Sequence, residues 1–346
     1  MLFLILAAPS CPQGDLTRGG EPARIRSVTL DARSPPGAAM LPRLKTLGVT
    51  HITLIQFGFQ SRIDVPELRM RTEADWYSES DRGIRSLARQ ADSLGMGVIL
   101  KPHIWISRYN AEGQSRADLG FDAEPDWEAW QDQYRTLVLH YARLAEETGA
   151  DMLVVGTELA RAARERPEFW RGLIADVRGI YGGALTYAAN WWGEYEDIAF
   201  WEDLDYIGVQ AYFELCEDDA PAKAVLHKGW EPHKAAMQEL SRKTRRPILF
   251  TEIGYRNVPS AAREPWRWPN RSEVGTVEPD DALQARLYEV FFESLWSEPW
   301  FAGAILWKWR ADTSRRRNHL DFSPQGKLAE SVIEDWFTRG TADREE

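Results

Sequence analysis

Short runs of apolar and β-branched residues alternate along the chain with longer stretches in which apolar residues recur every three or four positions. The short runs are typical of buried parallel strands, and the longer stretches are typical of amphipathic helices. Eight short runs predict strands: Ile25–Leu30, His51–Phe57, Gly97–His103, Met152–Thr157, Leu185–Asn190, Tyr206–Gln210, Pro247–Thr251 and Gly303–Trp307. Strands that alternate with helices form βαβ units and a parallel sheet.

The helical pattern is clearest over Asp126–Thr148, where Trp127, Trp130, Tyr134 and Leu137 recur on one face. We interpret this aromatic stripe as core packing, because an apolar stripe at helical spacing normally faces the protein interior. Further helices are predicted over Arg82–Leu94, Pro167–Tyr181, Lys223–Arg242, Asp281–Trp296 and Lys327–Phe337.

Eight strands alternating with helices, with no linker between them, predict a single (β/α)8 TIM barrel of the α/β class over residues 21–340. The longest irregular stretches follow the third, seventh and eighth strands, at Ile104–Pro125, Tyr255–Pro279 and Arg310–Gly326. All three would lie at the C-terminal end of the barrel, where barrel enzymes place their active sites.

The charge balance narrows the choice of partners. The chain has 42 Lys and Arg against 53 Asp and Glu, a net charge of −11. This balance argues against nucleic acid or an anionic membrane surface as partner, because both bind basic proteins. The 16 tryptophans instead indicate a neutral ligand that stacks on aromatic rings.

The apolar run Met1–Ala8 is too short to span a bilayer and lacks the positively charged start of a signal peptide. Residues 1–20 are either the remnant of an export or lipoprotein signal, with Cys11 as the lipid-bearing residue, or a disordered N-terminus. Localisation therefore stays open between an exported or lipid-anchored protein and a cytoplasmic one. No other segment is long and apolar enough to be transmembrane.

Two acidic residues stand where predicted strands end. Glu158 follows Thr157 at the end of the fourth strand, and Glu252 follows Thr251 at the end of the seventh. Because side chains at barrel strand ends face one shared region, we expect the two carboxylates to converge. Each could instead pair with an arginine or cap the next helix, since an unpaired buried carboxylate is costly. Two such acids in one barrel, surrounded by Trp and Tyr, favour catalysis.

Three segments carry a specific resemblance: GTELARAARERPEFWRGLIADVRGIYGGALTYAANW, FWEDLDYIGVQAYF and FTEIGY. In these the chain resembles glycoside hydrolase family 113, and the similarity extends from Gln56–Gln60 through Lys101–Trp105 to Ala304–Arg310. The resemblance implies a retaining β-mannan-hydrolysing barrel of the clan that carries its acids on strands four and seven. It further implies that Glu158 is the acid/base and Glu252 the nucleophile.

This assignment agrees with the chemistry of glycoside hydrolysis, in which the two carboxyl groups of a retaining enzyme lie about 5–5.5 Å apart. Glu252 would attack the anomeric carbon and form a glycosyl-enzyme. Glu158 would start protonated, because burial and the charge of Glu252 should raise its pKa, and would later act as base on water. The expected substrate is β-1,4-linked mannan or manno-oligosaccharide. An exo-acting β-mannosidase or another β-glycosidase of the clan is the alternative, followed by an inactive sugar-binding barrel.

Two pairs of residues at strand ends combine a polar group for sugar hydroxyls with an aromatic face for the sugar's C–H side. These are His103 with Trp105 after the third strand, and Asn190 with Trp191 after the fifth. His103 could equally be a satisfied core histidine. Thr157 stands where many clan members have an asparagine that contacts the 2-hydroxyl, so Asn190 or His103 is left to read that hydroxyl.

Other aromatic residues are candidate supports of the site. Tyr212, after the sixth strand, could hydrogen-bond Glu252, and Trp307, at the end of the eighth, could form a floor under the sugar ring. Core packing is the alternative for both. Trp266 and Trp268 lie in the seventh loop, where they could stack on more distant sugars or anchor the loop.

We expect neither a metal nor a cofactor. The six histidines make no HxH or HExxH spacing, and no dinucleotide, P-loop or nucleophile-elbow motif occurs. Cys11 and Cys216 fit neither a disulfide framework nor a zinc motif. The oligomeric state stays open.

Overall fold

The computed structural model describes residues 24–73, 76–268, 270, 272–312 and 319–339, so the predicted N-terminal segment 1–20 lies outside the described residues. Its strands are β1 (Ile25–Asp31), β2 (His51–Arg62), β3 (Leu68–Met70), β4 (Gly97–Arg108), β5 (Met152–Thr157), β6 (Ala184–Asn190), β7 (Tyr206–Gln210), β8 (Ile248–Ile253) and β9 (Phe301–Arg310). Its α-helices are α1 (Met40–Thr46), α2 (Asp81–Ser93), α3 (Glu124–Thr148), α4 (Ala160–Glu165), α5 (Pro167–Arg178), α6 (Lys223–Thr244), α7 (Asp281–Leu295) and α8 (Leu328–Thr338). Short 3-10 helices lie at Tyr77–Glu79, Arg116–Asp118, Trp201–Asp203 and Pro259–Ala262.

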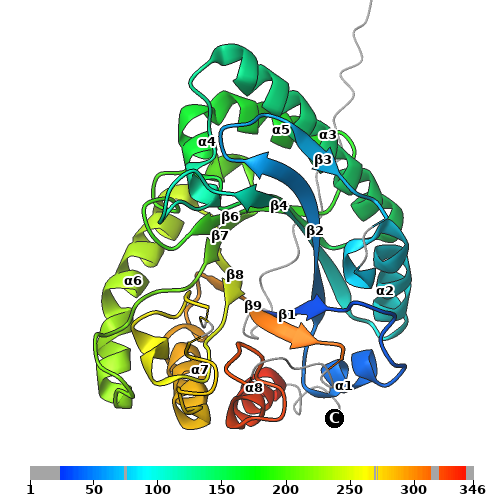
Figure 1. Ribbon diagram of the computed structural model, residues 1–346. Coiled ribbons are helices and arrows are strands. Elements are labelled where there is room, and N and C mark those ends of the chain that lie inside the picture. Colours follow the sequence, from blue (N-terminus) through cyan, green and yellow to red (C-terminus); the bar gives the residue numbers. More distant parts are fainter. Residues whose placement is uncertain (1–23, 74–75, 269, 271, 313–318, 340–346) are drawn as a thin grey trace, which may run out of the picture.

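The sheet closes on itself. Its strand order is β1-β9-β8-β7-β6-β5-β4-β2-β3, and β1 pairs in addition with β2. Every pairing around the ring is parallel, while the short β3 joins β2 from outside in an antiparallel hairpin. Figure 1 shows the ring of strands with the helices around it, and β1 beside β9 where the two ends of the fold meet. The prediction of a (β/α)8 barrel is therefore confirmed.

The second and third barrel strands are longer than predicted. β2 runs to Arg62 rather than Phe57, and β4 runs to Arg108 rather than His103. Only the first part of the predicted loop Ile104–Pro125, residues 104–108, is therefore strand. The two strands hydrogen-bond each other as far as the pair Arg62–Arg108, with β3 along β2. Their ends project beyond the barrel, where one face meets solvent, so the apolar run stops although the strand continues.

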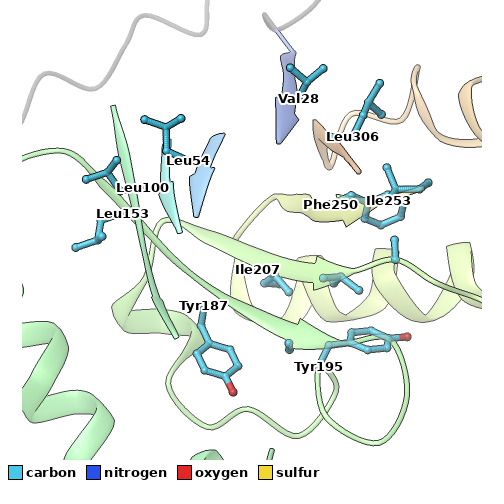
Figure 2. Packing of buried hydrophobic residues seen from close by; sticks show 14 of the residues in the cluster. Val28, Leu54, Leu100, Leu153, Tyr187, Tyr195, Ile207, Phe250, Ile253 and Leu306 are labelled. Atoms are coloured by element: carbon cyan, nitrogen blue, oxygen red, sulfur yellow. The ribbon is translucent and has the colours of Figure 1, made fainter. Parts of the chain in front are cut away.

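The core has two layers. A small cluster inside the barrel contains Ile99, Met152, Val154, Ala188, Leu249 and Ile305, and a larger one fills the space between the strands and the helices. Figure 2 shows side chains of the larger cluster carried by successive strands, among them Val28, Leu54 and Leu100. Trp127, Trp130 and Tyr134 of α3 are buried in this layer, which confirms that their stripe is core packing.

Two motif glycines allow neighbouring strands to approach each other. A Cβ atom on Gly208 of β7 would lie 2.2 Å from the carbonyl oxygen of Tyr187 in β6. A Cβ atom on Gly254, directly after β8, would lie 2.4 Å from the carbonyl oxygen of Trp307 in β9. A side chain at either position would push apart the strands that carry the site.

Across the described residues, none of the helices combines the length and the apolar character needed to cross a membrane.

Candidate active site

The two predicted acids meet at the C-terminal end of the barrel. Glu158 directly follows β5, and Glu252 lies in β8. Between them, the side-chain nitrogen of Gln210 donates to Glu158 Oε1 at 3.0 Å and to Glu252 Oε2 at 3.1 Å. Because both oxygens contact one nitrogen, they lie within about 6 Å of each other, which is compatible with the carboxyl spacing of a retaining glycosidase.

The register of the barrel accounts for this convergence. Asn190 of β6 pairs with Gln210 of β7, and Gln210 pairs with Glu252 of β8. Residues paired across parallel strands point to the same face of the sheet. The three residues therefore form one row at the end of the barrel, directed toward its axis.

The Glu252 carboxylate has donors on both oxygens. Lys101 Nζ lies 2.8 Å from Oε2, which also accepts from Gln210, and the Tyr212 hydroxyl donates to Oε1. Burial raises the pKa of Glu252, but the charge of Lys101 and these hydrogen bonds outweigh it, so the pKa lies below its usual value. Glu252 is thus held ionised and in one orientation.

Lys101 is fully buried on β4 and has an acceptor for each ammonium proton. Its Nζ lies 2.8 Å from Gln210 Oε1, the Thr251 carbonyl oxygen and Glu252 Oε2. Burial lowers the pKa of Lys101, while the charge of Glu252 opposes that shift. Because a neutral amine has only two N–H donors, the three acceptors match the charged form.

Glu158 has an unusual backbone conformation. Its φ of 54° lies in the left-handed region, which costs a residue other than glycine about 1–3 kcal/mol. Two hydrogen bonds to β6 hold the turn: Glu158 N donates to the Ala188 carbonyl at 2.8 Å, and Leu159 N donates to the Tyr187 hydroxyl at 2.8 Å. The side chain meets Arg116 Nη2 at 3.0 Å through its Oε2.

Each acid therefore has a basic partner, Arg116 for Glu158 and Lys101 for Glu252. Neither is sealed from solvent, since the Glu158 side chain is 18% exposed and that of Glu252 is 9% exposed. The pairing also differs from an ordinary structural ion pair, because both carboxylates additionally share the Gln210 amide. A reacting group could reach both acids from the solvent side.

His103 lies behind Arg116 rather than alone in the core. Its ring packs edge-on against Phe57, and its Nδ1 accepts from Arg116 Nη1 at 2.8 Å. Burial, followed by the charges of Arg116 and Lys101, holds the pKa of His103 well below its usual value, so the ring is neutral. Since Nδ1 accepts, the proton sits on Nε2, which is buried and has no hydrogen-bond partner among the described residues.

The aromatic residues predicted on or after the strands differ in their exposure to solvent. Trp191 and Tyr212 pack edge-on at 5.7 Å, next to Glu252. Trp307 lies half-buried within β9, because that strand runs on to Arg310 and does not end at Trp307 as predicted. Trp105, on the projecting end of β4, is 55% exposed.

The two tryptophans of the seventh loop are exposed but anchored at one side. Trp266 Nε1 donates to Glu214 at 2.9 Å, and the Trp268 ring packs on Phe322, which in turn packs on Tyr212. Trp268 is therefore linked through one ring to the residue that contacts Glu252.

Sequence reasoning missed three polar residues of the site, Lys101, Gln210 and Arg116, and also Glu194, which lies next to it. Lys101 and Gln210 interrupt or end otherwise apolar strands, which is a visible signal. Arg116 lies in a short 3-10 helix after β4, and Glu194 in the loop after β6, where nothing in the local pattern marks them. Among the described side chains, no group of three or more His, Cys, Asp or Glu is placed to hold a metal ion.

The chain is similar in sequence and structure to known glycoside hydrolases. The model of Glycoside Hydrolase Family 113 matches residues 31–337. A solved GH113 β-1,4-mannanase is 26% identical, with 91% of this chain and 99% of that chain covered and a TM-score of 0.76. The GH113 β-mannanase AaManA from Alicyclobacillus acidocaldarius is 27% identical, with 91% and 97% covered and a TM-score of 0.76.

A family 5 mannosidase from Rhizomucor miehei shares the fold at 12% identity, with 93% of this chain and 94% of that chain covered and a TM-score of 0.64. No curated protein matches the chain in sequence. The family match covers most of the chain, from before β2 to the end of α8. It shows that the chain belongs to Glycoside Hydrolase Family 113 and is a glycoside hydrolase.

Proposed function

We propose that this glycoside hydrolase cleaves β-1,4-mannosidic bonds in mannan or manno-oligosaccharides with retention of configuration. The observation that carries the proposal is the single Gln210 amide in contact with both Glu158 and Glu252. It brings the acids to a spacing at which one can attack the anomeric carbon while the other reaches the leaving oxygen. The choice of mannose is supported by the two family 113 mannanases of similar structure.

In this proposal Glu252 is the nucleophile. Lys101 and Tyr212 hold its carboxylate ionised and fix its orientation, as attack on the anomeric carbon requires. When the glycosyl-enzyme forms, the charge of Glu252 is lost. Lys101 then keeps two acceptors, the Thr251 carbonyl and the Gln210 side chain, so its ammonium group stays solvated by the protein.

Glu158 is the acid/base. Its more exposed side chain and its position after β5 suit a group that must reach the leaving oxygen and later an incoming water. In the first step protonated Glu158 gives its proton to the leaving sugar, and in the second step it takes a proton from water. We further propose that Trp307 and Trp191 supply aromatic faces for the sugar ring, and that Asn190 supplies an amide for a sugar hydroxyl.

The two acids can be told apart with azide and an aryl β-mannoside that has a good leaving group. In Glu252→Gly, azide enters the space left by the carboxylate and attacks from the same face, so the product is the α-mannosyl azide. In Glu158→Ala, Glu252 still forms the glycosyl-enzyme, and azide attacks from the opposite face to give the β-mannosyl azide. NMR of the azide adduct from each variant measures the configuration.

Without azide, Glu158→Ala should lower kcat on manno-oligosaccharides by about 10²–10⁴-fold, the usual contribution of a general acid. Glu252→Gly should show no turnover. Glu239→Ala is the matched control, since Glu239 is an exposed carboxylate on α6 whose ion-pair partner is Arg242. The same azide anomer from both variants, or activity of Glu252→Gly without azide, would reject the assigned roles.

The substrate is tested separately by comparing β-mannan, cellulose and xylan with the wild-type enzyme and Glu252→Gly side by side. We expect reducing sugar from mannan alone, and none with the variant. Chromatography of the products from mannohexaose distinguishes internal cleavage, which releases several oligosaccharides, from exo action, which releases mannose only.

A further inference from the structure

A third carboxylate lies next to the site and takes no part in the chemistry proposed above. Glu194, in the loop after β6, is 2% exposed and accepts three hydrogen bonds. Its Oε2 accepts from Asn190 N at 2.8 Å and from Asn190 Nδ2 at 2.6 Å, and its Oε1 accepts from the Tyr187 hydroxyl. Burial raises the pKa of Glu194 to about 7, although these hydrogen bonds oppose the shift. Such a group is costly to bury, so its position calls for a reason.

Through Tyr187, Glu194 reaches the turn that presents Glu158. The Tyr187 oxygen accepts from Leu159 N at 2.8 Å, so its own proton is directed to Glu194. Leu159 is the residue directly after Glu158, whose left-handed φ needs support from its surroundings. The order of the contacts is therefore Glu194, Tyr187, Leu159 and the Glu158 backbone.

On its other side, Glu194 sets the orientation of the Asn190 amide. Glu194 Oε2 accepts from both the backbone N–H and the side-chain NH2 group of Asn190, so the amide presents its NH2 group to Glu194. The amide oxygen is then left to face away from Glu194. Asn190 shares the row that Gln210 and Glu252 occupy at the end of the barrel, so that oxygen is available to accept from a hydroxyl of a bound sugar.

We propose that Glu194 is a positioning residue with two targets: the turn that carries Glu158, and the Asn190 amide, whose oxygen accepts a sugar hydroxyl. This inference rests on the proposed role of Glu158 as acid/base. Other charged groups around Glu194 are Arg164 and Asp197, which line the same small surface hollow, and Glu158. None of these hydrogen-bonds the Glu194 carboxylate among the described contacts, so Tyr187 and Asn190 are its relevant partners.

The first target is tested with Tyr187→Phe, which removes one hydroxyl and leaves Asn190 in place. If the acid/base is misplaced, hydrolysis slows for glycosides whose leaving group needs protonation. Hydrolysis of glycosides with a leaving group as good as 2,4-dinitrophenolate is unaffected, because that group leaves without a proton. We expect kcat/KM to fall about 10–100-fold on an unactivated oligosaccharide and less than about twofold on the dinitrophenyl glycoside. Tyr181→Phe is the matched control, because its buried hydroxyl bonds the Ala150 carbonyl at the other end of β5.

The second target is tested with Glu194→Gln, alone and combined with Asn190→Ala. Gln has the shape of Glu, but its NH2 group is a donor and would face either the Tyr187 hydroxyl or the Asn190 N–H groups, which are donors as well. We expect Glu194→Gln to show the same dependence on the leaving group and, in addition, a raised KM. The effect on KM should vanish once Asn190→Ala is present, because residues that act through one another are not additive.

Equal losses on both glycosides, or KM effects of Glu194→Gln and Asn190→Ala that multiply, would overturn the inference and leave Glu194 with a structural role. Failure of the proposed substrate looks different: the wild-type enzyme itself would leave mannosides intact. The leaving-group comparison is then made on the β-glycoside that the wild type does cleave, so the two failures stay distinguishable.

Discussion

Lys101 shows how one buried side chain can determine the behaviour of another. Its ammonium group contacts Glu252, and its charge is the main influence that lowers the pKa of that carboxyl against the effect of burial. Without the charge, burial would dominate and the pKa of Glu252 would rise. The acid side of the activity profile therefore depends on Lys101.

We predict that Lys101→Met moves the acid limb of the kcat/KM profile to higher pH. Glu252 must be ionised to attack, so a raised pKa means that activity is lost at a higher pH as the solution is acidified. The measurement is kcat/KM against pH, with kcat at the optimum also falling by about tenfold or more.

Lys45→Met is the control, since Lys45 is an exposed lysine that bonds the Gly95 carbonyl. An acid limb that stays in place in Lys101→Met would show that another group sets the ionisation of Glu252.

At the scale of residues, the sequence predicts the acids but not their partners. Glu158 and Glu252 follow apolar runs, so the barrel alone brings them to one end. Arg116 lies in a short 3-10 helix and Glu194 in a loop, and both are placed by contacts with residues of neighbouring strands, His103 and Tyr187. The positions of such side chains cannot be predicted from the sequence, because no periodic pattern determines the path of an irregular segment.

At the scale of elements, β8 and β9 come close enough at the site that Gly254 cannot take a side chain without rearrangement. We predict that Gly254→Ala destabilises the fold by about 1–3 kcal/mol, because its methyl group would meet the Trp307 carbonyl oxygen. In a protein of this size that corresponds to a loss of several degrees in Tm, measured by thermal unfolding followed by circular dichroism.

Gly37→Ala is the matched variant, because a Cβ there meets no atom of the described residues within 4 Å, and it should leave Tm unchanged. Equal Tm values for the two variants would mean that the strands adjust freely.

Strand order and strand length differ in how far the sequence determines them. The eight apolar runs and the helices between them determine a closed parallel barrel, since crossover connections place successive strands side by side. The ends of β2 and β4 escaped prediction because those residues pair with each other outside the barrel, where an apolar pattern is no longer needed. Trp105 lies on this extra length of β4 and is exposed.

At the scale of the whole molecule, the net charge of −11 is compatible with an uncharged polymer as substrate. Salt screens interactions between separated charges and has little effect where the ligand carries none. We therefore predict that kcat/KM on mannan changes by less than about twofold between about 0.05 and 0.5 M NaCl.

The assay needs a thermal melt at both salt concentrations, so that an effect on stability is not mistaken for one on binding. A steep fall or rise of kcat/KM with salt, at constant Tm, would instead indicate a charged substrate.

The left-handed backbone conformation of Glu158 has a consequence for attempts to raise the thermal stability of the enzyme. Gly and Asn adopt a positive φ more easily than Glu, so replacing Glu158 with either lowers the conformational free energy of the folded state at this position. Selection for thermal stability alone would favour such replacements and yield a stable protein without catalytic activity. Directed evolution of this enzyme must therefore measure hydrolytic activity in every round of selection.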